Sequence, residues 1–219
     1  MKIVTVALRQ LCEYYPASPG RKKVVPRDRV LLSTNNGLET ARVISEIKSS
    51  AKEEMDMKVI RKLNKNDYHV LKENRKKVNE VRPKIIKEIS RKNLSMSVTK
   101  INYTYDRKKL YIYYTAETRV DFRALIRVLG RKLKVRIQMV QIGVRDEVSL
   151  MGGIGLCGRE VCCSKFLKGL ESVNLEMARK QNISINPENI TGCCGRLLCC
   201  LRFENQMYSN DKNDNNKSN

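Results

Sequence analysis

The sequence predicts an α+β protein in which a small N-terminal β sheet or partial barrel is followed by a long helix, a β-β-α-β sandwich and a cysteine-rich repeat region. Three observations predict this class. Short β-type runs separated by turn residues fill the first 50 residues, apolar side chains then recur at helical spacing, and two β-rich runs precede a shorter helix and a last strand. This order is typical of helices packed on one face of a sheet.

These patterns divide the chain into four expected parts. They are an N-terminal β subdomain (residues 1–50), an α+β core (51–145), a cysteine-rich region (146–205) and a disordered tail (206–219). We expect disorder in the tail because residues 209–219 contain no apolar side chain.

The composition of the 219-residue chain limits its chemistry. Lys and Arg exceed Asp and Glu by 44 to 23, and this formal charge of +21 favours a polyanionic neighbour such as RNA. The single histidine, His69, argues against Ser-His-Asp catalysis and two-histidine zinc sites. We see no signal peptide and no apolar run of ~18 residues, so we expect a cytoplasmic chain whose eight cysteines stay reduced.

The N-terminal sheet is predicted from β-type runs at residues 2–8, 29–33 and 40–44. Turn residues separate them at 15–20 and at Asn35-Asn36-Gly37. An Asn-Gly pair between two such runs favours a primed turn, because both residues tolerate positive φ.

A long amphipathic helix is expected from Asn66, its predicted N-cap, to about Lys92. Pro83 should kink or split this helix, because proline removes a backbone donor and clashes with the preceding turn. The apolar positions at helical spacing are Leu71, Val78, Val81, Ile85 and Ile89.

Beyond the helix, the sequence predicts a hairpin from residues 95–105 and 109–116. It then predicts a helix over residues 121–133 and a strand over residues 135–142. The apolar stripe of that helix is Phe122, Leu125, Ile126 and Leu129. The hairpin tyrosines are able to stack on RNA bases, but we expect them to pack as ordinary strand residues. They are Tyr103, Tyr105, Tyr111 and Tyr113.

A repeated cysteine motif is the most informative feature. Residues 152–163 (the first box) and 192–200 (the second box) align at one constant offset of 37 residues. Three pairs of cysteines match, as do Gly158 with Gly195 and Arg159 with Arg196. The paired thiols, which we take as candidate ligands of a metal or cluster, are Cys157, Cys162 and Cys163 in the first box and Cys194, Cys199 and Cys200 in the second.

The residue types suit ligation. A metal needs thiolates, and a nearby arginine lowers the cost of ionising a thiol. We therefore expect Arg159 and Arg196 to balance the charge of the ligands, and Gly158 and Gly195 to let backbone amides approach the sulfurs. The spacing decides neither for zinc nor for an iron-sulfur cluster.

Six thiolates exceed one four-ligand site, so either two are spare or each triad awaits a ligand from another chain, which implies a complex. Cys12 lies far from both boxes, and we expect it to be a small apolar residue. Between the boxes, residues 174–182 have a helical pattern, and Asn186-Pro187-Glu188 can open the turn before the second box. The segment 144–147 carries both charges after a strand and offers a partner contact or an internal ion pair equally well.

Segments 119–123, 141–147, 177–182 and 186–187, together with the two boxes, closely resemble the RicT (YaaT) family. The resemblance implies a PSP-type C-terminal domain in a non-catalytic regulatory subunit that joins RicA-like and RicF-like proteins and carries [4Fe-4S] clusters. It also implies a specificity factor for ribonuclease Y in mRNA maturation, with effects on sporulation, biofilm and competence. Cys193 departs from the family pattern, which has another residue there.

Two other classes fit the residues. One is a zinc-stabilised RNA-binding module, which keeps the charge argument and drops the cluster. The other is a thiol-based oxidoreductase using adjacent cysteines, which can form a strained disulfide. A thioredoxin-like Cys-x-x-Cys opening a helix is absent from the sequence, which disfavours the enzyme.

Overall fold

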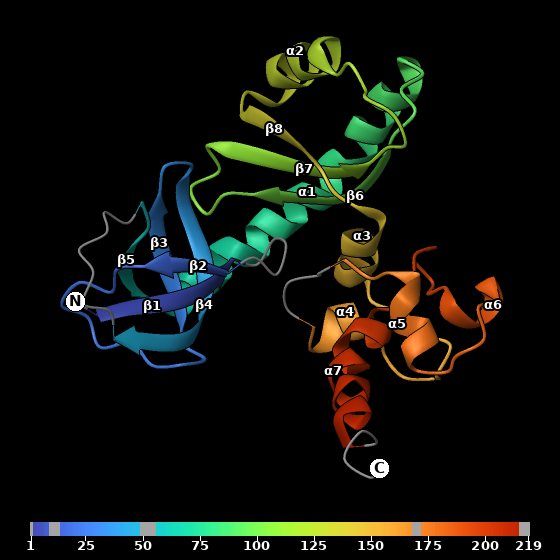
Figure 1. Ribbon diagram of the computed structural model, residues 1–219. Coiled ribbons are helices and arrows are strands. Elements are labelled where there is room, and N and C mark those ends of the chain that lie inside the picture. The colour runs from blue at the N-terminus through green and yellow to red at the C-terminus, as the bar shows by residue number, and fades with distance from the viewer. Residues whose placement is uncertain (1, 9–13, 49–55, 168–171, 215–219) are drawn as a thin grey trace. The chain divides into compact units, whose positions relative to one another are not determined.

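The computed structural model describes residues 2–8, 14–48, 56–167 and 172–214, and the chain divides into two compact units, Met1–Gln141 and Ile142–Asn219 (Figure 1). The first unit contains two β sheets, and the second contains both cysteine boxes. This confirms the predicted α+β class. Among the helices that the structure describes, none combines the length and the apolar character needed to cross a membrane.

The first unit begins with the predicted small β sheet, which has five antiparallel strands in the order β2-β1-β4-β3-β5. Val4, Val6, Val30, Leu32 and Val43 form its core, because alternate side chains of a strand share a face and β-branched residues fill it well. The strands are β1 (Lys2–Leu8), β2 (Tyr14–Ala17), β3 (Arg29–Thr34), β4 (Gly37–Lys48) and β5 (Lys58–Lys62).

The turn between β3 and β4 lies where the sequence predicts it, but its type differs. Thr34 pairs with Gly37 across a two-residue loop. Positive φ occurs at Gly37 (φ 115) and at neither Asn35 nor Asn36, so a primed turn was the wrong prediction. The glycine takes the unusual backbone conformation after the loop, where a side chain would also crowd the carboxylate of Asp106.

Helix α1 (Lys65–Arg91) is the predicted long helix, with its N-cap at Asn64 rather than Asn66. The Asn64 side chain accepts a hydrogen bond from the Asp67 amide at 2.9 Å, and the Asp67 carboxylate accepts one from the Asn64 amide at 2.7 Å. This reciprocal capping box fixes the helix start. The predicted apolar face is confirmed, with Val81, Ile85 and Ile89 buried.

Pro83 does not split the helix, which is continuous to Arg91. Proline removes one intrahelical hydrogen bond, from residue 83 to the carbonyl of Asn79. Asn79 and Pro83 are both exposed, so water can reach that carbonyl, while the buried face of the helix still packs.

The second sheet of this unit has the strand order β6-β7-β8. β6 and β7 form the predicted antiparallel hairpin, and β8 pairs parallel to β7 because helix α2 crosses over between them. Ile85 of α1, Ile112 of β7 and Leu125 and Leu129 of α2 are almost fully buried in one core. The elements are β6 (Ser97–Tyr103), β7 (Lys109–Thr115), α2 (Arg123–Leu133) and β8 (Arg136–Gln141).

The hairpin tyrosines are structural, as expected. Tyr111 and Tyr113 are buried with their rings stacked 6.2 Å apart, and the Tyr111 hydroxyl donates to Glu39 at 3.2 Å. The Tyr105 hydroxyl donates to the Asp67 carboxylate at 2.5 Å. The inward-facing tyrosines therefore serve the sheet and its contact with β4.

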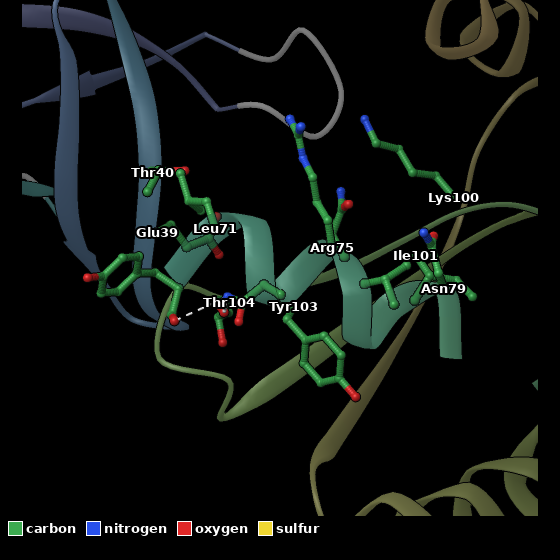
Figure 2. Close-up of a pocket in the computed structure, with 13 residues that line it drawn as sticks. Glu39, Thr40, Leu71, Arg75, Asn79, Lys100, Ile101, Tyr103 and Thr104 are labelled. Carbon is green, nitrogen blue, oxygen red and sulfur yellow. Dashed lines mark hydrogen bonds between the residues drawn. The ribbon is translucent and has the colours of Figure 1, made fainter. Parts of the chain in front are cut away.

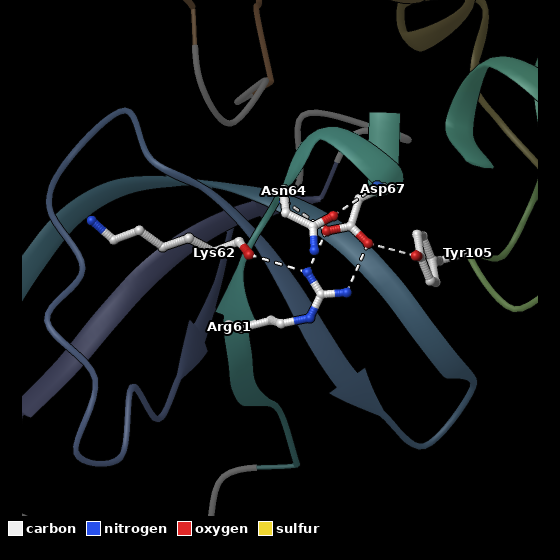
Figure 3. Close-up of polar contacts among 5 residues, drawn as sticks. All are labelled: Arg61, Lys62, Asn64, Asp67 and Tyr105. Atoms are coloured by element: carbon white, nitrogen blue, oxygen red, sulfur yellow. Dashed lines mark hydrogen bonds and ion pairs between the residues drawn. The ribbon is translucent and has the colours of Figure 1, made fainter. Parts of the chain in front are cut away.

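Asp67 is the centre of a polar network that joins β5, α1 and the segment after β6 (Figure 3). Its side chain is 1% exposed and accepts hydrogen bonds from both terminal nitrogens of Arg61, one of them 2.8 Å long. Tyr105 and the Asn64 amide complete its partners. The Arg61 guanidinium and these donors hold the pKa of Asp67 well below its usual range, so the carboxylate stays charged.

The second unit consists of short helices and turns. Its core is built from Met177, Ala178, Ile190 and Leu201. The predicted helical spacer and turn are confirmed by α5, capped by Asn174, and α6, capped by Asn186. The helices are α3 (Val144–Met151), α4 (Cys162–Lys165), α5 (Leu175–Lys180), α6 (Pro187–Ile190) and α7 (Cys199–Asp214).

Helix α7 extends to Asp214, whereas the sequence predicts a disordered tail from residue 206. Once a helix is nucleated, each further residue adds one hydrogen bond, so polar residues can continue it. The difference concerns residues 206–214.

Candidate cysteine-rich functional site

The two cysteine boxes have the same backbone structure at the offset that the sequence predicts. Each is a tight hairpin closed by a bridge, Ile154 with Glu160 in the first box, and Leu197 of the second box with Thr191 just before it. The matching hydrogen bonds from the amide of residue 155 to the carbonyl of 159, and from 192 to 196, both measure 2.8 Å. The repeat is therefore structural as well as sequential.

Gly158 and Gly195 close the turns of the two boxes, and their predicted role of letting backbone amides approach the sulfurs stays a prediction. Their φ values are 73 and 71, a region that favours glycine. The Gly158 amide donates to the Gly155 carbonyl at 3.0 Å, and the Gly195 amide donates to the Gly192 carbonyl at 2.9 Å. The glycines allow the turn to close, and their amides bond to carbonyl oxygens within it.

The paired thiols occupy equivalent positions in the two boxes. Cys157 and Cys194 lie in the turns, with Cys157 Sγ folded back toward Gly155. The adjacent pairs begin the helices α4 and α7, where free amide groups favour negative charge. These pairs are Cys162 with Cys163 and Cys199 with Cys200.

The boxes converge on one cavity of about 290 Å³. All six predicted ligands line it, as does Cys193, which the sequence marks as a departure from the family pattern. Cys163 is buried and Cys157 is exposed, so the cavity extends from the interior to the surface. Cys12 lies outside the described residues.

The cavity disfavours several simultaneous negative charges. Burial, and then the neighbouring thiol of Cys199, raise the pKa of Cys162 to about 11. Burial also raises the pKa of Cys163 and Cys200. Ionising the cluster of thiols therefore requires positive charge beside them.

Within the described parts of the chain, no three Cys, His, Asp or Glu side chains are arranged as a ready metal site. The cavity nevertheless fits a metal or cluster in its donor set, because soft thiol ligands from both boxes line one space. A metal or cluster core would supply the positive charge that these thiols need in order to ionise.

Arg145 of α3 lines the same cavity, and the sequence did not assign it to the site. Its Nη2 donates to the Leu197 carbonyl at 2.9 Å, which attaches α3 to the second box. Its Nε is buried and, in the described structure, has no hydrogen-bond partner. The only sequence signal is the charged segment 144–147 after a strand, which fits a partner contact and an internal ion pair equally well.

Arg159 and Arg196, the arginines predicted to support the ligands, are exposed and do not line the cavity. Glu160 does line it and forms an ion pair with Lys165. The balancing role of the two arginines stays a prediction.

Large apolar side chains are exposed on the second unit. Phe166 and Phe203 are 48% and 55% exposed, and their rings meet edge to face at 5.1 Å. Met207 is 59% exposed on the same helix as Phe203. An exposed aromatic pair with apolar neighbours is typical of a surface that binds another protein.

Comparison with known proteins gives two family matches. Residues 57–142 match the PSP1 C-terminal conserved region, and residues 172–215 match the third domain of PSP1-like proteins. The chain is 36% identical over 213 residues to stage 0 sporulation protein YaaT of Bacillus subtilis, covering 96% of this chain and 78% of that protein.

A shorter match is to an uncharacterized protein of Schizosaccharomyces pombe. It is 42% identical over 55 residues, which is 25% of this chain and 7% of that protein. No solved structure matches.

Proposed function

Because this chain belongs to the YaaT (RicT) family and carries the PSP1 C-terminal conserved region, we propose that it is a cytoplasmic, non-catalytic regulatory subunit. In this proposal it holds a [4Fe-4S] cluster at the cysteine cavity and acts with RicA-like and RicF-like proteins as a specificity factor for ribonuclease Y in mRNA maturation. Effects on sporulation, biofilm and competence would follow. The observation that carries the proposal is the convergence of both cysteine boxes on one cavity.

The residues that would hold the cluster are the six paired thiols. A cluster supplies a redox-sensitive centre that links the segments ligating it. This chain contributes two turns with the same hydrogen-bond pattern, which place the thiols at one cavity, and the Arg145 guanidinium in the cavity wall. Zinc at the same thiols is the alternative cofactor.

Partner binding is supported by two features of the second unit. Six thiols exceed the four of one cluster. The exposed Phe166, Phe203 and Met207 offer an apolar surface of the kind that another protein covers. We therefore propose that partner chains bind beside the cysteine boxes and share in the ligation.

The rival function, a thiol oxidoreductase, has less support. A reactive cysteine needs a lowered pKa and access to solvent. The pKa of Cys162 and of Cys163 is raised by burial instead.

The decisive experiment is anaerobic purification of the full chain with its partner proteins, followed by iron, zinc and acid-labile sulfide analysis and a visible spectrum. We expect brown protein in which iron and sulfide are roughly stoichiometric. Cys162→Ser and Cys199→Ser should each lose the cluster and partner association, while Cys12→Ser should keep both. Colourless protein that contains only zinc would contradict the cluster, and full cluster content in both box variants would contradict the ligand assignment.

The biological part of the proposal has a separate test. The gene should restore sporulation and ribonuclease Y-dependent messenger processing to Bacillus subtilis cells that lack YaaT. The Cys162→Ser variant should fail at equal protein level. Restoration of sporulation by that variant would separate the regulatory role from the cysteines.

A further inference from the structure

A second cavity, of about 410 Å³, lies in the first unit between α1, β6 and the start of β4 (Figure 2). It is far from the cysteines in sequence and shares no residue with their cavity. Nothing in the proposed function uses it. Its volume is in the range of small-molecule and nucleotide pockets.

The cavity is lined by apolar side chains and by buried polar groups that already have hydrogen-bond partners. Leu71 and Val78 of α1 and Ile101 of β6 provide apolar side chains. Asn74 is 5% exposed, and its Nδ2 donates to the Thr104 carbonyl at 3.3 Å. Because these polar groups are already bonded, the apolar side chains are the part of the wall that is left to contact a flat surface such as the face of a base.

The rim is basic and rich in amides. Figure 2 shows the side chains of Arg75 and Lys100 extending toward the same side, while the Tyr103 ring turns away from them. The amide side chains of Asn79 and Asn102 complete the rim. An amide offers both a donor and an acceptor, which suits the edge of a base.

The basic rim continues as a row along α1. Arg75, Asn79 and Arg82 follow one another at helical spacings of four and three, so they share one face. Arg82 Nη2 donates to the carbonyl of Val98, just inside β6, at 3.3 Å, which shows that this face lies along the strand. Since β6 is an edge strand of its sheet, the row lies beside an unpaired strand edge.

We propose that this cavity and the basic row beside it bind single-stranded nucleic acid, with backbone phosphates on Arg75, Arg82 and Lys100 and one unpaired base in the cavity between Leu71 and Asn79. The cations neutralise phosphates, and the apolar side chains and amides of the cavity contact a base that is not paired. A duplex cannot present such a base without unpairing it.

The observations favour nucleic acid over an acidic peptide. Among the described residues lining the cavity, the one carboxylate is Glu39, which is buried and accepts a hydrogen bond from Tyr111. Acidic side chains would pair with the cations equally well, but they have no group that matches the apolar side chains and the amides of the cavity. A nucleotide uses all three features.

The test is fluorescence anisotropy with the full chain and a fluorescein-labelled, mixed-sequence RNA single strand of about ten nucleotides, a length suited to such sites. Arg75→Ala/Lys100→Ala should weaken binding roughly tenfold or more at moderate salt and reduce the slope of log affinity against log salt by about 1.4. The matched control, Lys77→Ala/Lys84→Ala, removes the same charge from the opposite face of α1 and should retain most of the affinity. A labelled DNA strand of the same sequence distinguishes the two nucleic acids.

A second variant, Arg75→Gln/Lys100→Gln, removes the charges but keeps long polar side chains, and it should lose affinity in the same way. The circular dichroism spectrum should be unchanged in every variant, because these side chains line the rim. An equal loss of affinity in the Arg75/Lys100 variant and in the Lys77/Lys84 control would mean that the RNA is attracted by overall charge, and it would overturn the proposal. Absence of RNA binding would overturn it as well. Duplex RNA that binds as tightly as the single strand, or more tightly, would overturn it too. So would a labelled polyglutamate peptide that binds as tightly and loses affinity in the same Arg75 and Lys100 variants. Iron content does not enter this result, so it stands or fails apart from the cluster.

Discussion

Replacing Asp67 with asparagine should destabilise the first unit by about 3 kcal/mol. The substitution keeps the volume of a side chain that is 1% exposed. The carboxylate accepts two bonds from Arg61, one from Tyr105 and one from the Asn64 amide. The oxygen of the substituted side-chain amide can accept about two of these bonds, and its NH2 group faces the remaining donors. The variant therefore loses one charge-assisted bond, worth about 1.5–3 kcal/mol, and one neutral bond, worth about 0.5–1.5 kcal/mol.

The assay is thermal and urea unfolding of the full chain followed by circular dichroism, since the chain has no tryptophan. We expect the melting temperature to fall by roughly 6–12 °C, at about 2–4 °C per kcal/mol. The control is Glu73→Gln, which breaks an ion pair of 2.7 Å with Arg107 at a carboxylate that is 64% exposed. Its melting temperature should change much less, because water replaces an exposed ion pair. Equal shifts in the two variants would refute the reasoning.

The same network predicts a pH dependence. Its donors hold the pKa of Asp67 below the usual value in the folded state. The stability that the carboxylate contributes is therefore complete above the unfolded pKa of about 3.9 and is lost as pH falls toward the folded pKa. The difference in unfolding free energy between the wild type and Asp67→Asn should shrink in acid, and a difference that grows there would contradict the network.

Three further outcomes are expected. Gly195→Ala should destabilise the chain by about 1 kcal/mol because of its positive φ, whereas Gly130→Ala in α2 should stabilise it by about 0.5–1 kcal/mol; urea unfolding measures both, and equal signs would contradict the turn argument. Leu125→Ala should cost about 3 kcal/mol, and a cost below about 1 would mean that the core collapses around it. Arg145→Gln should lower the reduction potential of a bound cluster, because a positive charge beside it is lost; an unchanged potential in a folded variant would exclude that influence.

Local sequence patterns predicted most elements of the first unit because their signals are short-range. The hairpin of β6 and β7, the apolar face of α1 and the stripe of α2 each depend on residues a few positions apart. The errors arose where a distant contact decided. Asn64 rather than Asn66 caps α1, because Asp67 also binds Arg61 of β5 and Tyr105 after β6.

The cysteine site divides in the same way. The offset of 37 residues was visible in the sequence and reappears in the hydrogen bonds of both boxes. Arg145 was not assigned, because nothing in its neighbourhood in the chain shows that its guanidinium reaches Leu197, 52 residues later. The positive φ of the paired glycines was not predicted either, since the φ of a turn is a property of its closed backbone.

By itself, the sequence determined the α+β class, the family, the basic character and the match of six cysteines between the two boxes. Composition, periodicity and repeated motifs are properties of the linear chain. Only the tertiary structure decided that the two boxes share one cavity with Arg145, that Arg159 and Arg196 remain outside it, and that Arg75 and Lys100 border a second one. The physical reason is that a cavity is formed by side chains from separate elements, and their distance depends on how those elements pack.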